Sequence, residues 1–260
     1  MGDASCYNAA MVRAAFPIRA WFKAVRQTLA ASFDELFPPI VEQELREAEA
    51  AGWSIDPVAA YCPRCGASVG SGEATSKGCS HCVGQPIAWD RIVRLGMYTE
   101  PIAPWIVAMK YHKQWPWAPW FGEALARNIG PISDPGKTII CPVPMVALRR
   151  WRRGFSQTQL MADAFAKVSG LRVVPVLRRK GWQRSQTKVL ASQRKANVSS
   201  AFRIDAVDLS GHDVWLIDDV KTSGSTLTAC TRLLRTMGAW HVNVAVAAVA
   251  DPKQADFKLK

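Results

Sequence analysis

The spacing of apolar residues changes along the chain and predicts a different kind of structure in each part. In the first 50 residues, Leu, Phe, Trp and Ala recur at helical spacing, which predicts helices at Ile18–Leu36 and Val41–Ala51, interrupted by Pro38 and Pro39. Residues 61–86 are rich in Gly, Ser and Cys and have no periodicity. Beyond them, short apolar runs alternate with helical patterns, so we expect a helical start, an irregular middle segment and a larger mixed part.

The mixed part predicts a parallel sheet. Expected strands lie at Ile92–Tyr98, Thr138–Val143, Leu171–Val176, Val214–Ile217 and Val242–Val249. Expected helices lie at Trp105–Lys110, Glu123–Asn128, Ser156–Ser169 and Ser225–Met237. A Trp/Pro-rich stretch, 115–120, separates the first two helices, and a long polar, basic loop is expected at Arg178–Asn197. Strands that alternate with helices form a parallel sheet covered by helices on both faces, so the predicted fold class is α/β.

The length of 260 residues fits one domain of ordinary size with a small appendage. We expect a helical extension at 1–60, a small cysteine module at 61–90 and the α/β domain at 91–260. Apolar residues make up 49% of the chain and charged residues 21%, as is usual for a globular protein in water. No apolar run reaches the ~18 residues that a membrane helix needs, and the start lacks the apolar core of a signal peptide. A cytoplasmic protein without a membrane span is therefore expected.

Four of the seven cysteines form two closely spaced pairs, Cys62/Cys65 and Cys79/Cys82. Each Cys-x-x-Cys turn places two sulfurs on one side of a tight loop, and in a reducing compartment two such turns indicate a structural zinc site. Without a metal, this segment of small and polar residues would have no core. His81 lies inside the second pair and is expected to be a bystander. Because four protein ligands close a tetrahedral site, we expect no catalysis at this zinc.

A second motif follows the expected strand at Val214–Ile217. Asp218 and Asp219 come at its carboxyl end, where open α/β sheets bind ligands, and the run Thr222–Thr226 (Thr222, Ser223, Gly224, Ser225, Thr226) opens a helix. Backbone amides and hydroxyls at a helix start bind anions, and paired acids bind sugar hydroxyls or a metal ion. The simpler alternative is a turn with a helix cap, but a cap needs only one such residue. The motif therefore predicts a site for a sugar phosphate.

The same residues resemble known proteins. Leu216–Thr226 is similar to the loop that binds phosphoribosyl diphosphate (PRPP) in type I phosphoribosyltransferases. The stretch Cys141–Gln157, with its Cys-Pro-Val-Pro start and its arginine cluster, resembles the ComF family, as do Arg179–Gln186 and Gln193–Phe202. ComF-like proteins also combine a cysteine zinc module with this fold, and the resemblance covers roughly residues 61–250.

The resemblance implies a role for each matching residue. Asp218 and Asp219 would hold the ribose hydroxyls, directly or through Mg²⁺, and Thr222–Thr226 would hold the 5-phosphate, with Ser223 where the family more often has Thr. The PRPP-binding set also includes Lys221, Pro144 and Arg149, the last two beside the pyrophosphate. The candidate catalytic residues are Asp218, Asp219 and Arg179. Residues 178–197 correspond to a loop that closes over the site in such transferases.

The positive charge is concentrated in one segment. The net charge is +12, yet residues 149–203 contain fourteen Lys or Arg and one acid, Asp163, so the rest of the chain is nearly neutral. Trp151, Phe155 and Trp182 lie among these cations, and grooves for single-stranded nucleic acid combine aromatic and cationic side chains in this way. The candidate nucleic-acid residues are Arg152, Arg153, Trp182 and Arg184. PRPP would itself use some of these cations, and a solvated surface is the plainest alternative.

The family adds a partner and leaves the activity open. ComF-like proteins are associated with natural transformation, which implies single-stranded DNA and competence-machinery proteins as partners. Residues 105–120, with Lys110, Tyr111 and Lys113, are a weaker nucleic-acid candidate or simply core. No motif surrounds His112, His212 or His241 that would indicate a general base. The chain is thus expected to be a phosphoribosyltransferase acting on an unidentified base, a non-catalytic PRPP sensor or nucleic-acid-binding protein, or an adaptor whose pocket is inactive.

Overall fold

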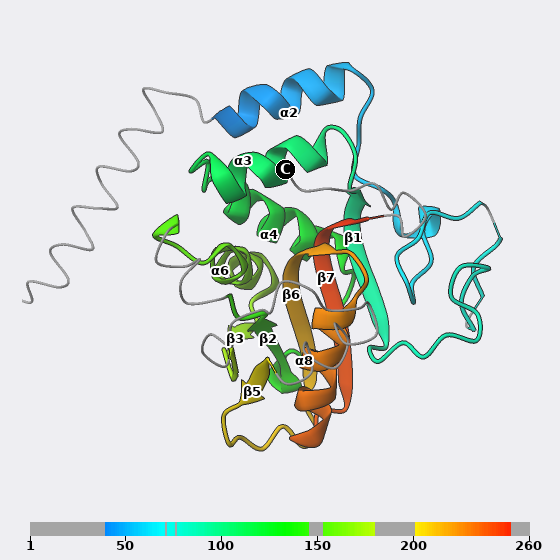
Figure 1. The fold of residues 1–260 in the computed structure, drawn as a ribbon, viewed down its shortest axis with the longest axis vertical. Helices are drawn as coiled ribbons and strands as arrows, with labels where there is room; N and C mark the ends of the chain where they lie inside the picture. Colours follow the sequence, from blue (N-terminus) through cyan, green and yellow to red (C-terminus); the bar gives the residue numbers. More distant parts are fainter. Residues whose placement is uncertain (1–39, 71, 76, 146–152, 180–200, 251–260) are drawn as a thin grey trace, which may run out of the picture. The chain divides into compact units, whose positions relative to one another are not determined.

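The computed structural model describes residues 40–70, 72–75, 77–145, 153–179 and 201–250 (Figure 1). The chain divides into two compact units, Met1–Arg46 and Glu47–Lys260. Helix α2 (Ile40–Ala50) spans this division and confirms the helix expected at Val41–Ala51. The helix expected at Ile18–Leu36 lies outside the described residues. The fold below is that of the second unit.

A five-stranded parallel sheet forms the centre of this unit. Its strands lie in the order β1-β7-β6-β2-β3, with β1 at Arg91–Met97, β2 at Thr138–Pro142, β3 at Arg172–Val173, β6 at Asp213–Lys221 and β7 at His241–Val249. All four pairings are parallel. Strand β7, which lies between β1 and β6, is buried along nearly its whole length, as expected for an apolar strand covered on both faces. The predicted α/β class is therefore confirmed.

Two crossover helices define where a ligand can bind. The chain leaves β2 through α6 (Gln157–Ser169) toward β3, and it leaves β6 through α8 (Ser225–Thr236) toward β7, in the opposite direction. Right-handed crossovers in opposite directions place their helices on opposite faces of the sheet. In agreement, α6 packs against α4 and β2, whereas α8 packs against β5, β6 and β7 (Figure 1). The carboxyl ends of β2 and β6 consequently form a topological switch point, where α/β sheets bind ligands.

Helix α4 (Trp117–Asn128) shows that one expectation was wrong. The Trp/Pro-rich stretch does not separate the helices, because most of it is the start of α4. Pro116 precedes this helix and Pro119 lies in its first turn, where proline is tolerated since the first backbone N–H groups have no partner within the helix. Helix α3 (Ile102–Tyr111) has the same design with Pro104.

The tryptophans of this region pack inward. Trp105 and Trp117 are buried and stack with ring centroids 4.4 Å apart, and Trp120 packs edge-on against both. Of the two interpretations for residues 105–120, core packing is therefore confirmed for Trp105 and Trp117.

A short antiparallel pair was missed by the sequence. Strands β4 (Leu177–Arg179) and β5 (Phe202–Ile204) pair with each other, and the strand expected at Leu171–Val176 shrinks to β3. The two strands flank residues 180–200, which lie outside the described part. Each strand is three residues long, too short for a periodic signal, and its partner lies more than twenty residues away.

The cysteine segment has little regular structure. Besides the single 3₁₀ turn η1 (Val58–Ala60), its described residues form the isolated bridges Tyr61↔Ser68 and Thr75↔Gly78. A second 3₁₀ turn, η2 (Pro135–Lys137), leads into β2. The described helices are all too short or too polar to cross a bilayer.

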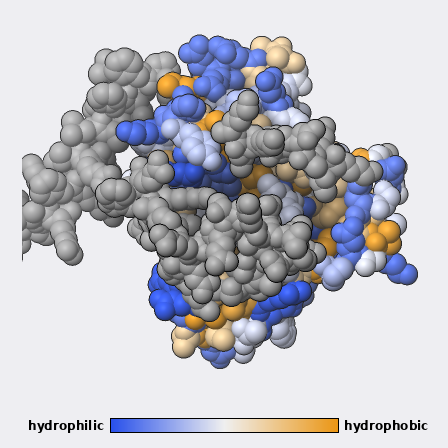
Figure 2. Space-filling view, in the orientation of Figure 1, coloured by the Kyte–Doolittle hydropathy of each residue, from blue (hydrophilic) through white to orange (hydrophobic). Residues whose placement is uncertain are grey.

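The described surface mixes polar and apolar areas (Figure 2). Its exposed large apolar side chains come from separate elements, among them Val83 of the cysteine segment, Tyr111 and Trp115 after α3, and Trp240 before β7. Scattered residues of this kind are ordinary on a protein surface.

Candidate functional site

Strand β6 continues through both acids and ends at Lys221. Because successive side chains of a strand point to opposite faces, Asp218 and Asp219 face different surroundings. Asp218 is partly exposed, whereas Asp219 is 9% exposed. The two neighbouring carboxylates are therefore not equivalent.

Both carboxylate oxygens of Asp219 have partners. The Nζ atom of Lys110 lies 2.7 Å from Oδ1, and Nε2 of Gln157 donates to Oδ2 at 2.8 Å. Lys110 comes from the end of α3, and Gln157 is the first residue of α6. Burial opposes the charge on Lys110, but the ion pair outweighs it and raises the pKa of Lys110. Asp219 thus ties two helices to the end of the central strand.

This network extends to the arginine cluster. Nη1 of Arg153 donates to Oε1 of Gln157 at 2.8 Å, and its guanidinium lies 5.2 Å from the centre of the Tyr111 ring. Arg153, a candidate nucleic-acid residue, is therefore linked to Asp219 through one side chain. Neither Lys110 nor Gln157 was predicted to belong to the site, because the contacts join residues 109 and 62 positions apart. One feature of the sequence indicated that Gln157 belongs to the site: it lies in the stretch Cys141–Gln157, which resembles the ComF family.

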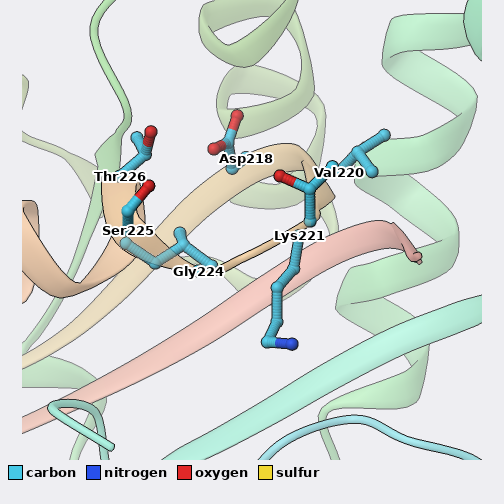
Figure 3. Close-up of a pocket in the computed structure, with 8 residues that line it drawn as sticks. Asp218, Val220, Lys221, Gly224, Ser225 and Thr226 are labelled. Carbon is cyan, nitrogen blue, oxygen red and sulfur yellow. The ribbon is translucent and has the colours of Figure 1, made fainter. Parts of the chain in front are cut away.

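A small cavity lies on the Asp218 side of the strand (Figure 3). It is lined by Asp218, Val220, Lys221, Thr222, Gly224, Ser225, Thr226 and Leu227. Gly224 precedes α8 as its N-cap and has a left-handed backbone (φ 74°). The Ser223 hydroxyl donates to Oγ of Ser225 at 3.1 Å and accepts from the Ser225 N–H at 3.4 Å. The first turn of α8, with the hydroxyls of Ser225 and Thr226, lines one part of the cavity, and Asp218 lines another.

The carboxyl group of Asp218 changes its charge near neutral pH. Loss of hydration and the neighbouring Asp219 carboxylate raise the pKa of Asp218 to about 7, although Lys110 and Arg179 oppose the shift. The backbone N–H of Asp219 also donates to Oδ1 of Asp218 at 2.9 Å. A cation or hydroxyl group brought to this carboxylate would favour its ionised form.

Lys221 is oriented away from the hydroxyls of the loop. Figure 3 shows its amino end extending away from Ser225 and Thr226. The side chain is 8% exposed, and burial lowers the pKa of Lys221 while Cys65 and Cys82 oppose that shift. Its ammonium group is therefore within electrostatic reach of the cysteines, and only its stem and backbone contribute to the cavity wall.

The remaining predicted residues fall into two groups. Pro144 follows β2, where the N–H of Val143 donates to the carbonyl of Ile217, so this turn lies beside the end of β6. Arg179 of β4 lies over the Phe202 ring and is near enough to Asp218 to favour its carboxylate. Four candidates lie outside the described residues: Arg149, Arg152, Trp182 and Arg184.

The four paired cysteines come together as expected. Their Sγ atoms all lie within 4.8 Å of one another and are buried. The separations are 3.8 Å for Cys62–Cys82, 3.6 Å for Cys65–Cys79 and 4.0 Å for Cys79–Cys82. A tetrahedron with Zn–S bonds of about 2.3 Å has S–S edges of about 3.8 Å, so the cluster has the size of a tetrathiolate metal site.

The thiols of the cluster differ in their tendency to ionise. Burial opposes ionisation of Cys62, but backbone N–H groups of Cys65 and Arg64 outweigh it and lower the pKa to about 7. Burial raises the pKa of Cys65 and of Cys82. A bound cation would favour four thiolates, because its positive charge offsets the electrostatic cost of burying four negative sulfur atoms.

Among the described residues, the other cysteines and His81 have no part in this cluster. Burial raises the pKa of Cys141 to about 12 and that of Cys230 well above its usual value, as for small core residues. His81 is exposed, and its backbone carbonyl accepts a hydrogen bond from Gln85.

Comparison with curated proteins places the chain in a family. No family model matches it. The DNA utilization protein YhgH of Salmonella typhi is 30% identical over 190 residues, which cover 70% of this chain and 81% of that protein. This chain belongs to the ComF family. Competence protein F of Haemophilus influenzae is 29% identical over 195 residues, which cover 71% of this chain and 82% of that protein.

The solved structures to which the chain is similar match it at low overall similarity. The glutamine PRPP amidotransferase of B. subtilis, solved with ADP and GMP, has a TM-score of 0.37 and 17% identity, with 51% of this chain and 26% of that chain covered. A purine phosphoribosyltransferase of Pyrococcus horikoshii has a TM-score of 0.32 and 16% identity, with 61% and 78% covered.

Proposed function

We propose that this ComF-family protein binds PRPP in the cavity between Asp218 and the start of α8. One observation carries the proposal: a carboxylate and a hydroxyl-rich helix start line the same cavity at the switch point of the sheet. The helix start suits the 5-phosphate, because its amides and dipole favour an anion. Asp218 suits the ribose hydroxyls, directly or through Mg²⁺. The pyrophosphate would then lie toward Pro144 and Arg149.

In this proposal the two acids have separate tasks. Asp218 is the ligand, and Asp219 is a positioning residue, because Lys110 and Gln157 already occupy both of its oxygens. Arg179 acts on the charge of Asp218 rather than on the 5-phosphate. The resemblance implies that residues 178–197 close over the ligand and exclude water; of these, Arg178 and Arg179 belong to β4, and residues 180–197 lie outside the described part.

Two metal ions complete the proposed chemistry. Zinc in the cluster Cys62/Cys65/Cys79/Cys82 would hold the cysteine segment in place, and the free state of all described cysteines suits the reducing cytoplasm, where we place the protein. Mg²⁺, when bound with PRPP, neutralises pyrophosphate charge. The boundaries 61–90 for a zinc module and 91–260 for a phosphoribosyltransferase-like domain remain predictions.

We further propose a role in DNA uptake with contact to single-stranded DNA. Its support is the names of the relatives, a competence protein and a DNA utilization protein, and the concentration of cations in residues 149–203. Arg153, beside the exposed Tyr111 ring, is a described example of a cation next to an aromatic side chain. Competence-machinery proteins would be further partners.

The protein would consume PRPP if a base can accept the phosphoribosyl group at this site, and it would only sense PRPP if no base can. His212 and His241 lie at the amino ends of β6 and β7, at the opposite edge of the sheet from the cavity, and His241 pairs with Asp213. Neither is placed to act as a general base there. Both transfer to an unidentified base and non-catalytic sensing are compatible with such a site, and PRPP turnover with candidate bases separates them.

Calorimetry with PRPP and Mg²⁺ tests the central proposal. Asp218→Asn should weaken binding at least tenfold, because the amide cannot pair with the cation or accept both hydroxyls. Asp213→Asn is the matched control, since it removes the same charge from the other end of β6 and should leave affinity unchanged. Absence of PRPP binding by the unchanged protein, or equal binding by Asp218→Asn, would refute the proposal.

A parallel titration with a labelled oligonucleotide tests the DNA site. Its affinity should fall steeply with salt and should survive the Asp218→Asn/Asp219→Asn double change, because the two sites use different residues. Simultaneous loss of both activities in a folded variant would contradict separable sites.

A further inference from the structure

The cavity loop and the cysteine cluster are joined through Trp89. Its indole Nε1 donates to the carbonyl of Arg64 at 2.8 Å, and Arg64 lies between the cluster residues Cys62 and Cys65. The far edge of the same ring lies against Gly224, where an added Cβ would come within 2.9 Å of Trp89 Cη2. Trp89 is 6% exposed, so one buried side chain touches both the metal knuckle and the loop glycine.

Lys221 also lies against the loop glycine. Its backbone ends β6, and a Cβ added at Gly224 would come 3.6 Å from Lys221 Cε. Gly224 is therefore packed between Trp89 and the stem of Lys221.

The knuckle is fixed firmly to the sheet. The carbonyl of Pro63 accepts from the N–H of Ile92 at 2.7 Å, and the carbonyl of Gly66 accepts from Nη1 of the fully buried Arg94 at 2.6 Å. Gly66 also packs so closely on β7 that a Cβ would come 2.9 Å from Val249 Cγ2. Pro63 and Gly66 are thus anchored to the sheet on either side of the Arg64 carbonyl. A metal bound to Cys62 and Cys65 would restrain this carbonyl further, because these two cysteines flank Arg64 in the chain.

We propose that Trp89 couples metal binding at the cysteine cluster to anion binding at the loop. A metal-loaded knuckle fixes the Arg64 carbonyl, the carbonyl fixes the Trp89 ring, and the ring supports Gly224 in the left-handed conformation that begins α8. The cluster then acts as a positioning element for the loop as well as a local crosslink. The proposal rests on the PRPP-binding function above, and coupling between two ligands must be reciprocal.

The first test is Trp89→Phe in the full, zinc-loaded chain. Phenylalanine keeps a smaller ring in the core but removes both the N–H that reaches Arg64 and the far edge of the indole that lies against Gly224. We expect unchanged zinc content, about tenfold weaker PRPP affinity, and about tenfold faster hydrogen exchange of the amides in residues 224–228. Trp240→Phe is the matched control, because the Trp240 side chain is 66% exposed, whereas Trp89 is 6% exposed. Equal affinity and exchange in both variants would overturn the proposal.

The second test measures reciprocity. Zinc affinity is determined by competition with a chelator, with and without saturating Mg²⁺–PRPP. In the unchanged protein PRPP should tighten zinc about tenfold, and in Trp89→Phe this factor should fall toward one. A factor of one in the unchanged protein would overturn the coupling.

These measurements separate two kinds of failure. If the unchanged protein binds no PRPP, the proposed function fails, but hydrogen exchange at residues 224–228 still tests the coupling. Faster exchange at residues 224–228 in Trp89→Phe than in Trp240→Phe would indicate that the Trp89 ring stabilises the loop, whichever ligand the loop binds. PRPP binding with no effect of Trp89→Phe on affinity or exchange would leave the proposed function intact and remove the coupling.

Discussion

Removal of Lys110 tests whether Asp219 is a positioning residue. The Lys110–Asp219 pair is short, 2.7 Å, and its side chains are only 14% and 12% exposed. At an effective dielectric constant of about 20, two unit charges at that distance attract each other by about 6 kcal/mol, and lost hydration offsets part of this. Breaking a buried pair by removing one partner typically costs about 3–5 kcal/mol. We expect about 3 kcal/mol for Lys110→Met, because Gln157 still donates to Asp219.

Urea unfolding with zinc present throughout measures this loss. Lys113→Met is the matched control: Lys113 is exposed, three residues further along, and should lose less than about 0.5 kcal/mol. Asp219→Asn should also be destabilised, but the double variant Lys110→Met/Asp219→Asn should lose about 2 kcal/mol less than the sum of the single changes, because no unpaired charge remains. Additive effects, or equal stability of Lys110→Met and Lys113→Met, would refute the assigned role.

Three further changes address the site and its support. PRPP affinity should rise about tenfold per pH unit from about pH 5 to pH 7 and then level off, because the raised pKa of Asp218, about 7, keeps its carboxyl group protonated at lower pH. Calorimetry should show a smaller dependence of affinity on pH in Asp218→Asn. An unchanged pH dependence in that variant would argue against Asp218 as the ligand. Gly122→Ala should lower the melting temperature by several degrees or prevent folding, since its Cβ would lie 2.1 Å from the Met161 carbonyl where α4 meets α6, whereas Gly70→Ala should have little effect. Arg94→Lys should cost about 2–4 kcal/mol in urea unfolding, because lysine cannot reach Asp56, Ser68 and the Gly66 carbonyl together; a loss below about 1 kcal/mol would mean that the fork geometry is unimportant.

The sequence alone determined the features that depend on local pattern. Two Cys-x-x-Cys turns predicted a cluster whose sulfurs the structure brings within 4.8 Å, because each turn fixes two sulfurs by itself. The alternation of apolar runs and helical patterns predicted the parallel sheet, since the periods of strands and helices are properties of a few consecutive residues. The helix start after Gly224 was likewise readable from its run of small residues.

Only the tertiary structure decided which atoms meet. Strand alternation implies that Asp218 and Asp219 face opposite ways, but their different roles come from Lys110 and Gln157, which reach Asp219 from separate helices. Lys221 was grouped with the phosphate ligands by its place in the motif, yet its amino end extends away from Ser225 and Thr226. Trp89 showed no local signal, because its importance lies in two contacts, with Arg64 and with Gly224, that the fold brings together from distant parts of the chain. Local periodicity sets each element, whereas the partners of a buried polar or aromatic side chain depend on how all the elements pack.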